Sequence, residues 1–238
     1  MAVTLIAELS TNHGGSLTRA QQFIETFAKA GADIIKWQWT RIRHLRLEDP
    51  QYAWFSQAEL SNTDHRALVR TCQENGVIGM ATVYHTDDIQ ELLDVGLTHL
   101  KIGSGEAHRA DIALHLRALP GAFKHIYVST GIRFPHAEYK LLPEVEFLAC
   151  ISRYPAPHGC VRALLATSGV KGWSDHSIGI NECQAAVVAG ATIIEKHVMM
   201  TTQARTPQLW EANAADFAAF RQWTREDPEA KFIDRWAR

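Results

Sequence analysis

The sequence predicts an α/β fold in which eight parallel strands close into a (β/α)8 TIM barrel, and three observations support this prediction. Eight apolar runs of strand length alternate with segments of helical pattern. The runs are continuously apolar rather than alternating, as expected of strands that are covered on both faces. No G-x-G-x-x-G motif follows the first run, which disfavours the alternative, an open doubly wound sheet. We therefore expect a single domain over residues 1–238.

The order of the elements follows from these runs. The predicted strands span residues 3–9, 33–38, 77–82, 99–103, 125–130, 145–150, 170–174 and 192–198. Helical patterns cover residues 17–30, 63–75, 86–95 and 180–189, and Asn62 is the expected cap of the second. A left-handed residue is needed where a helix ends, and the glycines that follow these helices suit that position: Gly31, Gly76, Gly96 and Gly190.

Two segments interrupt the repeat. Residues 40–62 form a long aromatic-bearing loop after the second strand, and a loop of this length is typical of a lid or binding element. Residues 224–238 form a mixed-charge tail that is too short for a second domain.

Composition excludes two classes of function. Apolar residues make up 46% of the chain and the formal net charge is −2, so neither a basic excess nor a clustered basic tract indicates nucleic-acid binding. The densest positive run, residues 41–46, is predicted to be a solvated loop. No apolar run reaches the ~20 residues that span a membrane. The start of the chain has the pattern of a strand rather than a leader, and Cys72, Cys150, Cys160 and Cys183 form no C-x-x-C pair, so we expect a cytoplasmic protein with reduced thiols.

Two histidines end the last two predicted strands. His176 and His197 are 21 residues apart, about one strand–helix–strand crossover, so their strands can pair in parallel. Both imidazoles would then lie at the carboxyl-terminal edge of the sheet, with Asp175 and Glu195 just before them. This pattern indicates a divalent-metal site. The alternative is that they are ordinary surface histidines or partly buried ones with satisfied hydrogen bonds, since the chain has 12.

Other strand ends carry polar groups as well. Lys36 and Lys101 lie inside apolar strands, and a buried lysine needs a partner. Hydroxyls follow at Thr82, Ser104, Ser129 and Ser174, so the set suits a phosphate and a carboxylate together. Ion pairs within the barrel core are the structural alternative.

Seven collinear motifs between Ile6 and Val198 resemble those of the sialic acid synthase family, the phosphoenolpyruvate-condensing enzymes that make N-acetylneuraminate, legionaminate and pseudaminate. The motifs are IAELSTNHGG, AGADIIKWQ, LKIGSGEA, VSTGI, SRYPAP, GWSDHSIGI and ATIIEKHV. The resemblance implies a TIM barrel, a divalent metal (manganese or magnesium), and C–O cleavage of phosphoenolpyruvate during condensation with an N-acetylated sugar.

The resemblance also implies roles for individual residues. His176 and His197 resemble the metal ligands, with Glu8 near the metal and its water, and Glu8 or Glu195 would handle the water's proton. The phosphoenolpyruvate-binding set corresponds to Lys36, Thr82, Lys101, Ser104, Ser129 and Ser174, and residues near the acceptor sugar correspond to Gln38, Glu106 and Tyr154. By this resemblance the metal polarises the acceptor's aldehyde, C3 of phosphoenolpyruvate attacks it, and phosphate leaves.

Three departures fall on the acceptor side. Gln208 stands where the family has an aspartate, Ser152 stands where it has an asparagine, and the chain ends before the C-terminal antifreeze-like domain that lends an arginine to a neighbouring subunit. Arg205, Arg133 or an arginine of residues 40–62 is a possible replacement, and each is expected at the surface. Trp210 is the best candidate for an aromatic in the acceptor pocket, whereas Trp37 should pack against the helices.

The leading hypothesis is therefore a metal-dependent, sialic acid synthase-like transferase of carbohydrate biosynthesis. It would join phosphoenolpyruvate to an aldose such as N-acetylmannosamine, giving a nonulosonate-type 2-keto acid and phosphate. The alternatives are a lyase or aldolase, a divergent synthase with another acceptor, and a non-catalytic sugar-binding barrel. Neither nucleic acid nor membrane is an expected partner. A homodimer is possible by the resemblance, while the acceptor and the metal stay open.

Overall fold

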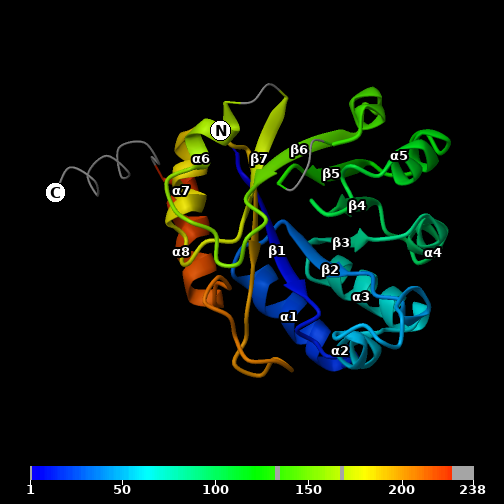
Figure 1. The fold of residues 1–238 in the computed structure, drawn as a ribbon. Helices are drawn as coiled ribbons and strands as arrows, with labels where there is room; N and C mark the ends of the chain where they lie inside the picture. Colours follow the sequence, from blue (N-terminus) through cyan, green and yellow to red (C-terminus); the bar gives the residue numbers. More distant parts are fainter. Residues whose placement is uncertain (1, 132–134, 167–168, 227–238) are drawn as a thin grey trace.

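A computed structural model describes residues 2–131, 135–166 and 169–226 and shows eight strands in a closed barrel, with neighbouring strands parallel and in sequence order (Figure 1). The predicted fold class is confirmed. The strands are β1 (Thr4–Ser10), β2 (Ile34–Gln38), β3 (Ile78–Val83), β4 (His99–Ile102), β5 (His125–Ser129), β6 (Val145–Cys150), β7 (Val170–Asp175) and β8 (Ile193–His197).

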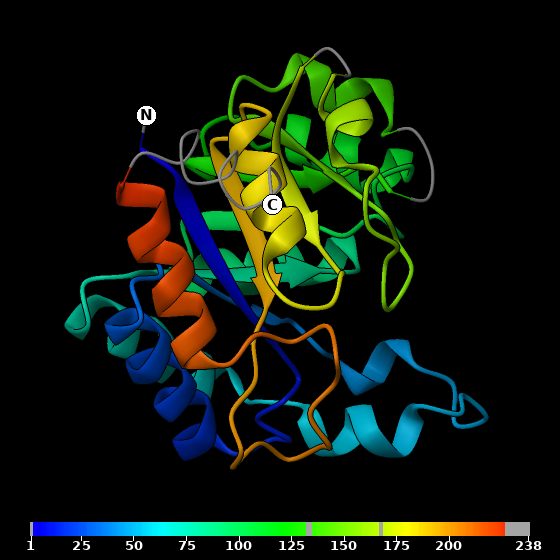
Figure 2. The same ribbon diagram turned by 90° about the vertical axis from the view of Figure 1, so that its left-hand side faces the viewer.

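Helices surround the barrel. They are α1 (Leu17–Lys29), α2 (Tyr52–Ala58), α3 (Asn62–Glu74), α4 (Ile89–Asp94), α5 (Ala110–Arg117), α6 (Val161–Leu165), α7 (Asn181–Val188) and α8 (Ala214–Arg225), with 3-10 turns at η1 (Ile42–His44), η2 (Thr86–Asp88) and η3 (Ala137–Leu141). Strands β1 and β8 pair and close the barrel. Helix α8, which comes after β8 in the chain, lies beside α1 (Figure 2). None of the helices in the described ranges is long and apolar enough to cross a membrane.

Three details differ from the sequence-based expectations. The cap of α3 is Ser61 rather than Asn62: Ser61 and Asp64 exchange side-chain and backbone hydrogen bonds in a capping box, which leaves Asn62 as the first helical residue. The helical pattern over residues 86–95 divides into η2 and α4. Residues 40–62 are not a continuous loop, since they contain η1 and α2.

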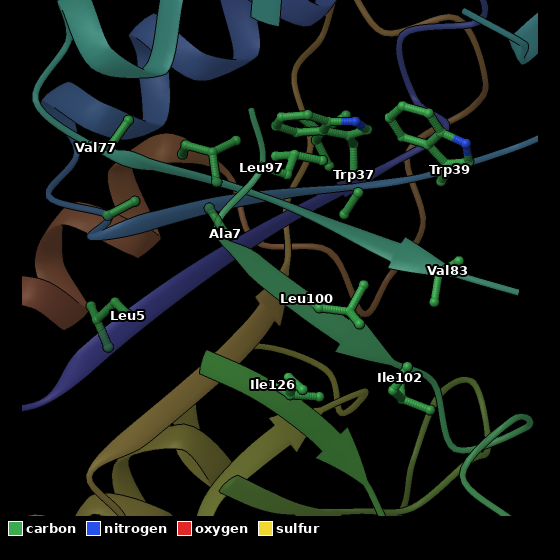
Figure 3. Packing of buried hydrophobic residues seen from close by; sticks show 14 of the residues in the cluster. Leu5, Ala7, Trp37, Trp39, Val77, Val83, Leu97, Leu100, Ile102 and Ile126 are labelled. Atoms are coloured by element: carbon green, nitrogen blue, oxygen red, sulfur yellow. The ribbon is translucent and has the colours of Figure 1, made fainter. Parts of the chain in front are cut away.

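The core has two layers because strand side chains alternate between the two faces of the barrel wall. Outward-facing residues such as Leu5, Ala7, Trp37 and Leu100 pack between the strands and the helices (Figure 3). Inward-facing apolar residues form a separate cluster that fills the barrel: Ile6, Ile34, Met80, Tyr127, Leu148 and Ile193. This inner cluster is a floor on which the polar side chains nearer the carboxyl ends of the strands rest.

Close packing inside the barrel explains one glycine. A Cβ at Gly172 of β7 would lie 2.4 Å from Leu148 Cδ2 and 2.5 Å from the Ile193 carbonyl oxygen. No larger residue fits there without moving backbone, so Gly172 lets β6 and β8 approach at the level of the floor. The four helix-ending glycines of the sequence analysis, Gly31, Gly76, Gly96 and Gly190, all have positive φ, as predicted.

Arg221 of α8 links the last helix to the first two βα units. Its guanidinium donates to the carbonyls of Val3 (2.9 Å) and Gly31 (2.7 Å) and forms an ion pair with Asp33. Asp33 in turn accepts from the backbone N–H of Leu5 at 2.7 Å. This network fixes the amino-terminal side of the barrel, opposite the strand ends that carry the polar groups.

Candidate active site

One cavity of about 290 Å³ opens at the carboxyl-terminal mouth of the barrel. It collects thirteen of the fourteen residues that the sequence singles out: Glu8, Lys36, Gln38, Thr82, Lys101, Ser104, Glu106, Ser129, Tyr154, Ser174, His176, Glu195 and His197. Gln208 is the exception. It lies on the segment after β8, where its Nε2 donates to the Thr206 carbonyl at 2.7 Å and its backbone N–H donates to Glu211 at 2.8 Å.

Two buried lysines converge in this cavity. Lys36 of β2 forms ion pairs with Glu8 and, at 3.3 Å, with Glu195, and it donates to Thr82 Oγ1 at 2.9 Å. Lys101 of β4 lies 3.4 Å from Glu195 and donates to Ser129 Oγ at 2.7 Å. Both ammonium groups are therefore held at the surface of one cavity by hydroxyls and carboxylates from four strands, β1, β3, β5 and β8.

Burial and neighbouring charge act in opposite directions on this cluster. Burial lowers the pKa of Lys36 to about 8, and Glu195 opposes this by favouring the ammonium form. Burial opposes the charge of Glu195, but Lys101, Lys36 and the two histidines outweigh it and lower its pKa to about 2. Glu195 is thus a carboxylate at neutral pH, and it favours the charged form of Lys36.

The two histidines lie together, as their strand positions predict. β7 and β8 pair in parallel, and the ring centroids of His176 and His197 are 5.4 Å apart. Nδ1 of His176 donates to the Ile151 carbonyl at 2.7 Å, so Nε2 carries the lone pair and accepts from the Tyr154 hydroxyl at 3.0 Å. Burial lowers the pKa of both imidazoles, and the neighbouring His176 and Lys36 lower the pKa of His197 further, so both are neutral at pH 7.

These side chains fit a divalent metal as a partial donor set. Neutral imidazole is a metal ligand, and a backbone carbonyl that fixes the tautomer is its usual support. Nδ1 of His197 and Oε1 of Glu8 are buried without a hydrogen-bond partner, and they leave coordinating capacity unused. However, no three His, Cys, Asp or Glu side chains in the described part of the chain form a metal-binding group. A metal here would take its other ligands from water and substrate.

Asp175 does not join the histidines. It is fully buried, forms an ion pair with Lys196, and accepts from Trp173 Nε1 at 3.0 Å and Ser177 Oγ at 2.9 Å. Lys196 also donates to the Ser177 carbonyl at 2.6 Å. The pair thus ties β7 to β8 next to both histidines. The sequence carries a signal for it, since Lys196 and Asp175 face outward in strands whose outward neighbours are apolar.

The structure adds residues that sequence reasoning did not assign. Tyr84, Gly103, Gly105, Cys150 and Ser152 also line the cavity. Ser104 and Ser152 share a hydrogen bond of 2.6 Å, so the serine that departs from the family pattern contacts a residue of the predicted substrate set. A polar or aromatic residue just beyond a strand end is the signal for Tyr84 and Ser152.

The candidate replacement arginines are committed elsewhere. Arg205 bonds to Asn12 Oδ1 and Glu211 Oε1, which joins the segment after β8 to the segment after β1. Arg41 is buried rather than solvated, contrary to expectation, and is paired with Glu91 at 2.8 Å. Arg133 lies outside the described residues.

Trp210 contacts the ring of Tyr154, with centroids 5.4 Å apart, and Trp37 packs outside the barrel as predicted.

A parallel eight-stranded barrel with charged and hydroxyl groups converging at its carboxyl-terminal mouth defines an α/β-barrel protein with a polar cavity at that mouth. The NeuB family model matches residues 23–226. The chain belongs to the NeuB family.

Relatives with assigned names share the sequence over most of this chain. A pseudaminic acid synthase of Campylobacter jejuni is 30% identical over 227 residues, which cover 83% of this chain and 65% of that protein. An N,N'-diacetyllegionaminic acid synthase of Legionella pneumophila is 28% identical over 230 residues, covering 84% of this chain and 65% of that protein. The chain thus spans about 65% of the length of these relatives.

Solved structures show the same fold. An N-acetylneuraminic acid synthetase of Leptospira borgpetersenii in complex with citrate superposes with a TM-score of 0.83 at 24% identity, covering 97% of this chain and 85% of that one. The spore coat polysaccharide biosynthesis protein SpsE of Bacillus subtilis superposes with a TM-score of 0.80 at 26% identity, covering 98% and 70%.

Proposed function

We propose that this protein condenses phosphoenolpyruvate with the aldehyde of a sugar such as N-acetylmannosamine, giving a nonulosonate-type 2-keto acid and phosphate. The observation that carries the proposal is the convergence of Lys36 and Lys101 with His176 and His197 in one cavity of about 290 Å³. Two cations suit the phosphate and the carboxylate of one substrate. The names of the family's relatives support the reaction class.

The lysines and hydroxyls would bind phosphoenolpyruvate. Lys36 with Thr82, and Lys101 with Ser129, form two ammonium–hydroxyl pairs on β2–β3 and β4–β5. Each pair presents a charge and a hydrogen-bond donor to one anionic group. Glu195 lies between the two ammonium groups and sets their spacing.

The acceptor would occupy the same mouth. Gln38, Glu106 and Tyr154 line the cavity at the ends of β2, β4 and β6 and offer hydrogen bonds to hydroxyl and amide groups. His176 and His197 would hold a divalent cation, manganese or magnesium. When bound, the cation supplies Lewis-acid polarisation of the aldehyde oxygen.

Proton transfer falls to Glu8. C3 of phosphoenolpyruvate bonds to the aldehyde carbon, and the aldehyde oxygen takes up a proton and becomes a hydroxyl. Water adds to C2 with loss of one proton. The tetrahedral centre then expels phosphate by cleavage of the C2–O bond to phosphorus, the remaining hydroxyl proton leaves with the phosphate, and the 2-keto acid is formed. Glu8 would take the proton from the adding water, since its Oε1 is buried without a hydrogen-bond partner. Glu195 is the weaker base, because the ammonium groups hold its pKa at about 2.

Phosphate release tests the proposal. The protein is incubated with manganese, phosphoenolpyruvate carrying ¹⁸O in the bridging position, and a panel of aldoses that includes N-acetylmannosamine. We expect phosphate release that depends on an aldose, with the label in the phosphate. Label retained in the organic product would contradict C–O cleavage. Binding of metal and phosphoenolpyruvate without phosphate release for any aldose would favour a non-catalytic barrel.

Location and assembly stay predictions. All four cysteines are free thiols, as expected of a cytoplasmic protein. We infer a cytoplasmic enzyme and a homodimer, and sedimentation of the purified protein tests the dimer.

A further inference from the structure

A second cavity, of about 330 Å³, meets the candidate active site at Gln38, Tyr84 and Glu106, which line both. It lies under residues 39–55, the segment that contains η1 and the start of α2. The shared residues lie at or just after the ends of β2, β3 and β4, whereas the two histidines lie at the ends of β7 and β8. A sugar with its aldehyde at the histidines can therefore direct a substituent across the mouth into this cavity.

Five of the twelve residues that line the second cavity are aromatic. Trp39, Phe55 and Tyr84 line it, and His44 and His85 form a stacked pair with ring centroids 3.8 Å apart. A cavity of ~150 Å³ holds one benzene ring, so this one has room for a planar group together with its linker. Aromatic walls favour flat apolar groups.

The charged groups of the wall are already paired. Arg41 donates to Glu91 at 2.8 and 3.0 Å and to the Leu60 carbonyl at 2.6 Å. Arg109 donates to the Tyr84 carbonyl at 2.6 Å and pairs with Asp111. Neither guanidinium is thus left to neutralise a phosphate.

The remaining charged and titratable groups add no net positive charge. Asp88 is buried and pairs with Arg43 and with His44 at 3.0 Å. Burial, His44 and Arg109 lower the pKa of His85, which keeps that ring neutral at pH 7. A phosphate group on the acceptor sugar would meet the carboxylates Asp88 and Glu106 in this cavity, and the described lining residues offer it no free cation.

Unused hydrogen-bonding groups indicate a polar but neutral occupant. Trp39 Nε1 and Thr40 Oγ1 are buried without hydrogen-bond partners, and both residues line the cavity. Asp88 Oδ2 is likewise without one. One donor, one hydroxyl and one acceptor match a group that both accepts and donates hydrogen bonds, such as an amide.

We propose that the second cavity takes an uncharged, flat, partly apolar substituent of the acceptor sugar and discriminates against a phosphorylated one. This inference rests on the proposed function for the presence of an acceptor in the adjoining site. An aromatic N-acyl amino sugar is the probe that matches its chemistry, since it joins an amide to a planar ring.

Calorimetric titration tests the proposal without turnover. The protein with manganese and phosphoenolpyruvate is titrated with the alditols of N-acetylmannosamine, N-phenylacetylmannosamine and N-acetylmannosamine 6-phosphate, which cannot react because the aldehyde is reduced to an alcohol. We expect the phenylacetyl form to bind about tenfold more tightly than the acetyl form, as one buried ring allows, and the phosphate no more tightly.

Variants on one helix locate the effect. Phe55→Ala should remove the tenfold gain and leave the affinity for the acetyl form unchanged. Tyr52→Ala is the matched control, because Tyr52 lies on the same helix and lines neither cavity. Equal binding of the acetyl and phenylacetyl forms, tighter binding of the phosphate, a gain that survives Phe55→Ala, or no binding of any form would overturn the proposal. Phosphate release with another aldose would still support the proposed function.

Discussion

The ring of His176 lies 5.4 Å, centroid to centroid, from the ring of His197, at the ends of two neighbouring parallel strands. Neither ring reaches this position through a flexible loop. Strand pairing sets the separation, and the buried Asp175–Lys196 ion pair holds the same two strands together one residue away from each ring. The histidine pair is therefore preorganised by the barrel wall.

His197→Ala should lower manganese affinity at least about tenfold, because the variant removes one of two imidazole ligands. Electron paramagnetic resonance of free manganese measures the binding directly, without turnover. His125→Ala is the control, since His125 begins β5 at the opposite end of the barrel. Unchanged manganese affinity in His197→Ala would refute the metal assignment.

Lys101→Met should reduce phosphate release by about 10²–10³-fold, as expected when one buried donor to a reacting anion is removed. The loss should appear in kcat/KM for phosphoenolpyruvate. Lys171→Met is the matched control, because its side chain is 60% exposed and pairs with Glu146 near the amino-terminal ends of β6 and β7, away from the mouth. Equal activity of the two variants would contradict the role of Lys101.

Substitutions of Glu8 and Lys36 should have coupled, non-additive effects on the free energy of unfolding. Removing one partner of a buried ion pair leaves an uncompensated charge, which costs about 3–5 kcal/mol of unfolding free energy. We expect Lys36→Met to show a loss of this size and the double variant Glu8→Gln, Lys36→Met to recover part of it. Urea unfolding of the four proteins measures the coupling, and additive losses would contradict it.

The buried side chain of His65 should make the free energy of unfolding fall in acid. Burial lowers its pKa to about 2, and Trp37 Nε1 donates to its Nδ1 at 3.1 Å. The unfolded chain takes up a proton below pH ~6.5 whereas the folded protein does not, so this stabilisation is present above pH ~6.5 and is lost as the pH falls. The slope for one proton is about 1.4 kcal/mol per pH unit.

His65→Gln keeps an acceptor for Trp37 and should flatten the pH dependence of unfolding by about one proton. His115→Gln is the control, because His115 is exposed on α5. Urea unfolding at several pH values below neutrality measures both slopes. Identical slopes in the two variants would show that His65 contributes nothing to acid sensitivity.

The barrel fold and most of the residues at its mouth could be predicted from the sequence, because both follow from the periodicity of side chains along strands. Apolar runs mark the strands, and residues two apart in a strand share a face, which places Lys36 with Gln38 and Glu195 with His197. The same rule places Trp37 outside, against His65 of α3. Such local rules do not depend on distant parts of the chain.

Local sequence patterns could not predict the second cavity or the hydrogen-bond partners of Arg41 and Arg205. Arg41 is buried because Glu91, 50 residues away, accepts its hydrogen bonds, and no local pattern predicts that pairing. Gln208 does not line the mouth cavity, and its segment is held to Glu211 and, through Arg205, to Asn12. Contacts between separate rim segments decide these positions.

Closure of the cylinder has a consequence for biosynthesis on the ribosome. Thr4–Ser10 pairs on one side with β2 but on the other only with Ile193–His197. During translation the edge of β1 that pairs with β8 therefore stays without its partner strand until nearly two hundred residues have been synthesised. Nascent chains of this protein should depend on chaperones that shield such an edge.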